Sequence, residues 1–335
     1  MNKLPESNNI FEQIKSLLES AKNSVIKNIN QTMIITYYQI GKIIIEDEQK
    51  GKERAEYAQE TIKNLSKKLT LEFGKGYSVR NLEQMRKFYL TYQKTQSLTA
   101  EFEKTFSLSW THYLRLMRIT IEDERNFYEI EALNNNWSVR ELDRQIDSSL
   151  YERLSLSRNK DEIKKLSQKG QIINEPKDLI KEPYVLEFLG LKEESNYSEN
   201  DLETAIIDKI EHFLLEMGKG FLFSGRQVRF TFDEDHYFVD LVLYNRLLQC
   251  FVLIDLKIGK LKHQDLGQIQ MYVNYYDRYV KAEHENKTIG IILCKDKNDS
   301  LVEITLPEDN KHIFASKYEM VLPSKEDLKK LIENK

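Results

Sequence analysis

The sequence predicts an α+β protein in which an all-helical N-terminal domain precedes an α/β domain in the C-terminal third. Apolar residues recur at helical spacing from residue 10 to about residue 153. The chain has only 12 Gly and 5 Pro, which favours long helices over turn-rich β hairpins. Beyond residue 200 the pattern changes to short apolar runs of strand length, with helical patterns before and between them.

Local signals place the N-terminal helices. Apolar periodicity predicts helices over 10–29, 32–48 and 54–71. The third helix is expected to end at the glycine-containing turn 73–77, and Ser78 is the expected N-cap of the next helix. Ser138 and Glu141 form an S-x-x-E capping box, which predicts another helix start at Val139.

We expect three segments along the chain: a helical domain over 1–155, a connection over 156–200 and an α/β domain over 201–335. The connection is rich in Lys, Ser, Asn and Glu. The α/β domain has the order α-β-β-β-α-β, with helices over 202–217 and 264–280 and strands over 221–232, 238–244, 251–258 and 289–294. Because a helix separates the last two strands, we expect a right-handed parallel crossover there.

Charge and cysteine usage narrow the class of protein. The net charge of −4 disfavours a protein that coats nucleic acid non-specifically, although specific binding needs only a local basic patch. Cys250 and Cys294 lie in apolar runs and are interpreted as buried free thiols of a reducing, cytoplasmic compartment. The N-terminus has no secretory pattern, and the apolar stretch 33–45 is too short to span a bilayer, so no membrane contact is expected.

The run 251–258 carries unusual charges for a buried strand. Its first four residues are apolar, which is typical of a strand covered on both faces. Asp255 and Lys257 follow, and the period of two puts both side chains on one face. Taken alone, the two residues are best interpreted as an ion pair at a strand end.

Two further acids change that interpretation. Asp240 stands within the apolar run 238–244, and Glu203 falls on the apolar stripe of the helix 202–217. Three acids and one Lys thus occupy positions that the local pattern reserves for apolar side chains. Several such failures in one domain are typical of a functional site.

Converging carboxylates repel one another unless a cation neutralises them. Mg²⁺ accepts one or two carboxylates and completes its shell with water and phosphate oxygens, and Mn²⁺ can substitute for it. The six His show no zinc-ligand spacing, and no phosphate-binding P-loop is present. The expected cofactor is therefore Mg²⁺.

The helix 264–280 adds Gln268 and Tyr272, which lie four residues apart on one face. Residues at this spacing are most often ordinary surface or core residues. Tyr272 also belongs to a group of tyrosines, with Tyr275, Tyr276 and Tyr279, much of which is expected to pack on the sheet.

Together these residues resemble the PD-(D/E)xK nuclease superfamily, whose restriction-endonuclease-like core is an α-β-β-β-α-β unit. Glu203 matches the helix acid, Asp240 the first strand acid, and Asp255-Leu256-Lys257 the D/E-x-K element. Gln268 and Tyr272 match the Q-x-x-x-Y element of the RecB-like branch. Val239 replaces the proline of the superfamily name, and Asp255 replaces the commoner glutamate.

The chain as a whole is similar to the bacterial YhcG-like family of this superfamily. The similarity includes FGKGYSVRNLEQMRKFY (73–89), LSWTHYLRLMRI (108–119) and EPYVLEFLGL (182–191). It also includes GRQVRF and FVDLVLYNRLLQCFVLIDLKIGKL in the α/β domain. Members of this family pair a helical N-terminal domain with a nuclease domain.

The resemblance implies hydrolysis of phosphodiester bonds, most readily in DNA. Asp240, Asp255 and the Leu256 carbonyl would hold Mg²⁺, with Glu203 completing the shell directly or through water. Lys257 would position the attacking water, and Gln268 with Tyr272 would support it. Arg226 and Arg229, expected on one face of the strand 221–232, either grip flanking phosphates or are solvated strand charges.

The N-terminal domain contains a candidate DNA-binding element. The turn 73–77 and the capped helix after it carry Lys75, Arg80, Arg86 and Lys87, which is compatible with a helix-turn-helix reader or with an ordinary solvated helix face. The winged-helix-like N-terminal region implied by the resemblance favours DNA binding. A non-catalytic DNA-binding or assembly subunit and an RNA-directed nuclease are the alternatives, and a homo-oligomer is compatible with the sequence.

Overall fold

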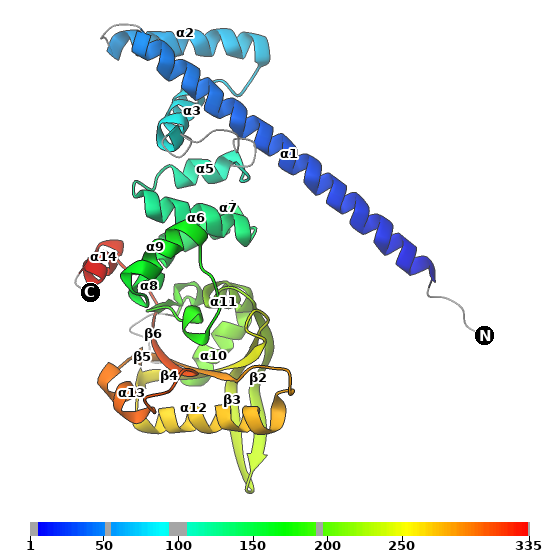
Figure 1. Ribbon diagram of the computed structural model, residues 1–335, viewed down its shortest axis with the longest axis vertical. Coiled ribbons are helices and arrows are strands. Elements are labelled where there is room, and N and C mark those ends of the chain that lie inside the picture. The colour runs from blue at the N-terminus through cyan, green and yellow to red at the C-terminus, as the bar shows by residue number, and fades with distance from the viewer. Residues whose placement is uncertain (1–5, 51–54, 94–105, 192–196, 334–335) are drawn as a thin grey trace. The chain divides into compact units, whose positions relative to one another are not determined.

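The computed structural model describes residues 6–50, 55–93, 106–191 and 197–333 (Figure 1). The chain divides into two compact units, Met1–Leu142 and Asp143–Lys335. Among the described helices, none combines the length and the apolar character that a membrane span requires.

The first unit is helical, as predicted. Its helices are α1 (Glu6–Lys50), α2 (Ala55–Phe73), α3 (Val79–Tyr92), α5 (Trp110–Leu116), α6 (Glu122–Asn134) and the start of α7 (Val139–Asp147). The predicted helices 10–29 and 32–48 form one continuous helix, because no Gly or Pro separates them. No strand lies in the described part of residues 6–142, so this part contains no β wing.

Aromatic packing holds the centre of the first unit together. The ring of Phe88 lies 4.9–5.4 Å, centroid to centroid, from those of Tyr92, Phe106, Trp110 and Tyr113. Both predicted caps are confirmed. Ser78 Oγ accepts the Asn81 backbone N–H at 3.3 Å, and Glu141 accepts the Ser138 N–H at 2.6 Å.

The second unit is built on a six-stranded mixed sheet with the order β1-β6-β5-β4-β3-β2. Its strands are β1 (Tyr184–Val185), β2 (Phe221–Phe232), β3 (Asp235–Asn245), β4 (Cys250–Lys260), β5 (Ile289–Asp296) and β6 (Ile313–Glu319). The four predicted strands are confirmed, and β4 and β5 are parallel as expected from the intervening helix. The sequence prediction missed β6 and the two-residue β1, which pair in parallel at the far edge.

Helices cover both faces of this sheet (Figure 1). On one face lie α10 (Glu199–Asp208) and α11 (Ile210–Met217), which the sequence predicted as one helix but which separate at Lys209. On the other lie α12 (His263–Tyr275), a π-helical turn (Tyr276–Val280) and α13 (Asp299–Thr305). Gly290 of β5 lets α12 approach closely, because a Cβ there would lie 2.7 Å from Ile269.

The remaining elements of this unit are α8 (Leu150–Leu156), α9 (Lys160–Lys169), 3₁₀ turns at Pro176–Leu179 and Glu187–Leu189, and α14 (Lys325–Glu333). A buried ion pair joins α8 to α11: Arg153 Nη1 lies 2.5 Å from Glu216 Oε1, and both side chains are fully buried. Glu216 also accepts the Val185 N–H at 3.0 Å. Burial tends to raise the pKa of Glu216, but Arg153 and Lys181 outweigh it and hold the pKa below its usual value.

This pair supports a first prediction. Arg153→Met leaves the buried Glu216 carboxylate without its cation and should lower the free energy of unfolding of the second unit by about 3–5 kcal/mol. The double variant Arg153→Met/Glu216→Leu should lose less, because it leaves no unpaired buried charge. Urea titration followed by thiol reactivity of Cys250 and Cys294 reports on this unit alone, since both buried thiols lie within it.

Lys177→Met is the matched control, because Lys177 pairs with Glu162 at 3.4 Å on the exposed surface. It should shift the urea midpoint little, since solvent screens such pairs. Equal losses in Arg153→Met and Lys177→Met would contradict the prediction.

Candidate active site

The candidate site lies where β3 and β4 diverge. The β3–β4 ladder ends at the pair Leu241–Ile254, whereas β4 continues alongside β5 through Lys257. Asp240 and Asp255 are the first residues beyond the end of that ladder. The predicted strand acids are therefore next to each other in register, at the point where the sheet opens.

Asp240 connects the two diverging strands. Its Oδ2 accepts the backbone N–H of Leu256 at 2.8 Å, so a carboxylate takes the place of a strand-to-strand hydrogen bond. Its Oδ1 accepts the side-chain amide of Gln227 at 3.1 Å. This carboxylate is half-buried and held from two sides.

Asp255 and Lys257 lie on one face, as the strand period predicts. Lys257 Nζ lies 2.9 Å from Asp255 Oδ2. Burial raises the pKa of Asp255, the adjacent Lys257 lowers it and Asp240 raises it again, with a net value of about 7. The side chain is only 3 % exposed. Near neutral pH this carboxyl group is thus poised between its two protonation states.

Lys257 is also in contact with a residue that the sequence analysis missed. Its Nζ lies 3.8 Å from Glu199 Oε2, at the start of α10. Burial lowers the pKa of Lys257, but Asp255 and Glu199 more than compensate, and the pKa lies above its usual value. Lys257 is therefore an ammonium ion at neutral pH and a source of positive charge, not a base.

Glu203 is placed by the capped start of α10. Ser198 and Asp201 form a capping box that begins the helix, and Glu203 lies one turn further on, 2 % exposed, on the face against the sheet. Arg226 Nε lies 3.0 Å from Glu203 Oε1, and Gln227 donates its amide to Oε2. Glu203 is thus linked to Asp240 through Gln227.

Gln227 is the second residue that sequence reasoning missed. Its amide bridges Glu203 and Asp240, and its backbone has φ 45°, a left-handed conformation that is costly for a residue with a side chain. The only sequence signal was a Gln in the middle of a strand between Arg226 and Val228. Left-handed backbone there could not be read from the pattern.

The helix α12 adds the predicted Gln and Tyr. Gln268 donates its amide to Tyr272 Oη at 2.6 Å, and the Tyr272 ring is buried. Burial raises the pKa of Tyr272, Gln268 lowers it, and the charges of Asp255 and Asp240 raise it further. Tyr272 packs in one apolar cluster with Leu253, which lies on the same face of β4 as Asp255, so this phenol, in its neutral form, lies beside the site.

The residues predicted to contact nucleic acid differ in their partners and in their exposure. Arg226 pairs with Glu203, and Arg229 donates to His236 at 2.8 Å. In the first unit Arg86 Nε lies 2.8 Å from Glu48 Oε2, so this cation joins α3 to α1. The other three predicted cations, on the turn before α3 and on α3 itself, are exposed: Lys75, Arg80 and Lys87.

The donor set fits a divalent cation in part. Within the described ranges, no three His, Cys, Asp or Glu side chains gather closely enough to form a metal centre. Two carboxylates, Asp240 and Asp255, do adjoin, and one of them is buried beside the other with a raised pKa. Together with the Leu256 carbonyl, which directly follows Asp255 in sequence, they match the one or two carboxylates that Mg²⁺ takes from a protein.

Comparison with solved structures gives weak likenesses. One is the crystal structure of a repair endonuclease from Pyrococcus abyssi, with a TM-score of 0.26 and 16% identity over 38% of this chain and 50% of that chain. Another is the EndoMS–dsDNA2 complex, with a TM-score of 0.27 and 14% identity over 40% of this chain and 51% of that chain. In both comparisons this chain covers about half of the solved chain.

Sequence comparison is more informative. Residues 177–333 match the YhcG PDDEXK nuclease domain, and residues 13–153 match the DUF1016 N-terminal domain. A relative from Escherichia coli (strain K12), named "Putative nuclease YhcG", is 38% identical over 95% of this chain and 92% of its own length. The chain therefore belongs to the YhcG family, whose C-terminal domain is a nuclease domain of the PD-(D/E)xK type.

Proposed function

We propose that this protein is a metal-dependent nuclease that hydrolyses phosphodiester bonds in DNA, with its active site at the divergence of β3 and β4. One observation carries the proposal: the buried Asp255 carboxylate adjoins Asp240 and the Lys257 ammonium at an opening of the sheet. An apolar strand end would be more stable than the buried Asp255 carboxylate and its Lys257 partner, so stability alone does not account for these two residues.

Asp240, Asp255 and the Leu256 carbonyl would hold Mg²⁺, or Mn²⁺ in its place. When bound, the ion supplies charge neutralisation at the scissile phosphate and a water of lowered pKa. Asp240 is already held by the Leu256 N–H and by Gln227, so its free lone pairs point in a restricted set of directions. Glu203 supports this arrangement through Gln227.

The other residues act on the substrate and the water. Lys257 carries its proton at neutral pH, so it would stabilise negative charge that develops on the phosphate and would orient the nucleophile by donating a hydrogen bond. Gln268 would orient the water or a phosphate oxygen, and Tyr272 fixes the Gln268 amide at 2.6 Å. Arg226, 42 % exposed, would contact a flanking phosphate while retaining Glu203.

The choice of DNA rests on the first unit and on family resemblance. Lys75, Arg80 and Lys87 extend from a turn and a capped helix, α3, that follow α2 in a helix-turn-helix order. We propose that this element binds the DNA backbone. The two buried free thiols, Cys250 and Cys294, are consistent with action in the cytoplasm.

The metal site can be tested by substitution. Asp255→Asn and Asp240→Asn should each reduce cleavage of plasmid DNA in Mg²⁺ by at least about a hundredfold, because each removes a charged metal ligand. Calorimetry should show weaker Mg²⁺ and Mn²⁺ binding in the same two variants. Asp309→Asn, an exposed acid of the same unit, is the control and should cleave normally.

Lys257→Ala should behave differently, keeping metal affinity while losing turnover, because Lys257 contributes charge rather than a metal ligand. Lys260→Ala, three residues further along β4 and exposed, should cleave like the wild type. Normal turnover by Lys257→Ala, or full activity in either aspartate variant, would refute the site. Wild-type protein that binds DNA but cleaves neither DNA nor RNA in Mg²⁺ or Mn²⁺ would support the non-catalytic alternative.

The raised pKa of Asp255 predicts a pH-dependent metal affinity. With a pKa of about 7, the carboxyl group holds a proton below neutrality that a cation must displace. Apparent Mg²⁺ affinity should fall about tenfold per pH unit below 7 and level off above it. In metal-free protein the folded state binds this proton more tightly than the unfolded state, so stability should decrease as pH rises from about 4 to 7. Asp255→Asn should remove both dependences, and calorimetry from pH 5.5 to 8.5 would measure the first.

The basic element of the first unit gives a further prediction. Reversing the charge of Lys75, Arg80 and Lys87 in the full chain should flatten the slope of log affinity against log salt by about two to three, since each lost duplex phosphate contact removes roughly 0.9. Reversal of the exposed Lys160, Lys164 and Lys165 of α9 is the matched control. An unchanged slope in the first variant would show that α3 is only a solvated face.

A further inference from the structure

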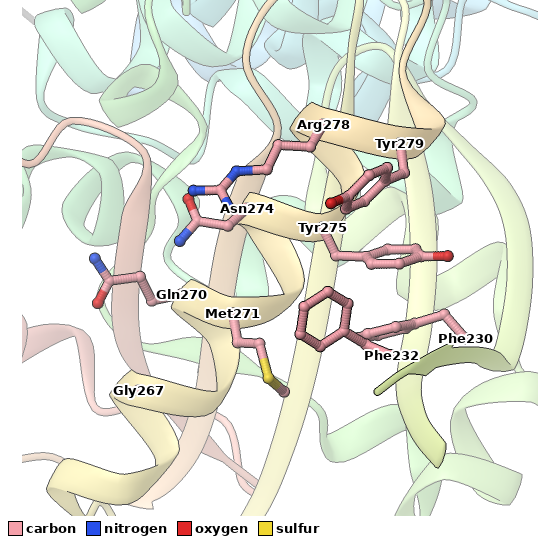
Figure 2. Close-up of a pocket in the computed structure, with 9 residues that line it drawn as sticks. All are labelled: Phe230, Phe232, Gly267, Gln270, Met271, Asn274, Tyr275, Arg278 and Tyr279. Atoms are coloured by element: carbon pink, nitrogen blue, oxygen red, sulfur yellow. The ribbon is translucent and has the colours of Figure 1, made fainter. Parts of the chain in front are cut away.

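A pocket of about 280 Å³ lies between the C-terminal end of β2 and the exposed side of α12 (Figure 2). None of the residues that line it is among those assigned to cleavage. Its lining combines rings, amides and one guanidinium: Phe230, Phe232, Gly267, Gln270, Met271, Asn274, Tyr275, Arg278 and Tyr279.

One wall of the pocket is a series of aromatic rings. Phe230 and Tyr275 are stacked, with centroids 4.1 Å apart and an interplanar angle of 21°. Tyr237 stacks on Phe230 at 5.4 Å, and Tyr279 lies 5.2 Å from Tyr275. Tyr237 and Tyr275 cover the ring of Phe230, which is buried, so the rings that remain free to stack on a ligand are the outer ones, Phe232 and Tyr279.

The rim of the pocket leaves large apolar surface in water. Phe232 is 52 % exposed and Tyr279 is 64 % exposed, on two elements that face one another across the opening. Around Gly267, in the interior of α12, the position that a Cβ would take has no contact within 4 Å other than its chain neighbours and the backbone of its own helix. Glycine destabilises a helix interior, and here no close packing calls for it, so its effect is to leave room in the pocket.

Polar groups complete the lining. Figure 2 shows the amides of Gln270 and Asn274 and the guanidinium of Arg278 gathered on one side, with the rings on the other. Amide groups can donate to and accept from the edge of a heterocycle, and an exposed guanidinium can pair with a phosphate. The pocket therefore offers a face for stacking and an edge for hydrogen bonding.

The pocket adjoins the candidate active site through one ring. Phe230 contacts Tyr272 edge to face, with centroids 5.4 Å apart, and Tyr272 accepts from Gln268. Gln268 and Tyr272 belong to the face of α12 that turns towards the site, whereas Gln270, Met271 and Asn274 line the pocket. A ligand in the pocket would be one aromatic layer from the residues assigned to cleavage.

We propose that this pocket binds a single unpaired nucleobase of the substrate, stacked on the Tyr275–Tyr279 side and hydrogen-bonded at its edge. The proposal rests on the nuclease function proposed above and narrows its substrate to nucleic acid with an unpaired nucleotide. The volume suits one ring system and lies below that of most drug-sized sites. Asp233, Glu234 and Asp235 form an acidic turn beyond Phe232, so the sugar-phosphate backbone approaches from the Arg278 side.

The test is a binding measurement that does not depend on cleavage. The probe is a DNA duplex with one bulged 2-aminopurine nucleotide, compared in EDTA with the same duplex carrying an abasic residue at that position. Wild-type protein should bind the base-bearing duplex roughly 5- to 100-fold more tightly and quench its fluorescence, as expected for one stacked base. Tyr279→Ala, Phe232→Ala and the pocket-filling Gly267→Leu should each remove most of this preference.

Three controls separate a base site from a general loss of structure. Tyr279→Phe keeps the ring and should keep the preference, and Phe223→Ala removes a 40 %-exposed ring at the other end of β2 and should also keep it. Gly267→Leu should not lower the melting temperature, because leucine favours the helix. Equal affinities for the two duplexes in the wild type, or an undiminished preference in all three pocket variants, would overturn the proposal.

The outcome is distinguishable from that of the nuclease proposal. If the preference is present and depends on the pocket while Mg²⁺ or Mn²⁺ elicits no cleavage, the base site stands and the nuclease function fails. If cleavage depends on Asp255 while the pocket variants retain their full preference, the nuclease function stands and the base site fails.

Discussion

The site depends on a hydrogen bond between a side chain and the backbone. Where β3 leaves β4, the Leu256 N–H loses its strand partner, and Asp240 Oδ2 takes that place at 2.8 Å. A buried N–H without an acceptor destabilises the folded state, and this carboxylate supplies the acceptor that β3 no longer provides. The same divergence places the D-x-K segment at the point where the sheet opens. Asp240 thus has a structural role and a proposed chemical one, and the first fixes its orientation for the second.

Buried charge is handled in two ways within one unit. Arg153 and Glu216 neutralise each other in the core, and additional backbone hydrogen bonds satisfy the remaining atoms of the pair. Asp255 pairs with Lys257 at 2.9 Å, yet burial and the nearby Asp240 raise its pKa to about 7. The Arg153–Glu216 pair is fully neutralised and contributes to stability. The second leaves a carboxylate that a cation can stabilise further, which is the behaviour expected of a metal ligand before binding.

The helix α12 connects the candidate site with the aromatic pocket. Residues four apart share a helix face, so Gln268 and Tyr272 turn towards the aspartates while Gly267, Met271 and Asn274 line the pocket. A helix in this position couples the two surfaces rigidly, with Phe230 between them. An arrangement of this kind would hold the scissile bond at a fixed distance from a bound base. The cleavage position would then be set by that distance and not by the base sequence.

Local periodicity allowed much of the site to be predicted from the sequence. The strand period placed Asp255 and Lys257 on one face, and the helix period placed Glu203 on the buried stripe of α10, because both depend only on neighbouring residues. Gln227 and Glu199 escaped prediction, since their roles arise from contacts between elements far apart in the chain and, for Gln227, from a left-handed backbone. Arg86 seemed equivalent to Lys75 in sequence, yet its pairing with Glu48 distinguishes it. The sequence by itself indicated that Glu203 and Asp255 lie on inward-facing positions, because such placement follows from short-range pattern. Only tertiary structure decided their partners and revealed the buried Arg153–Glu216 pair, because pairing needs the register of the sheet and the packing of helices upon it.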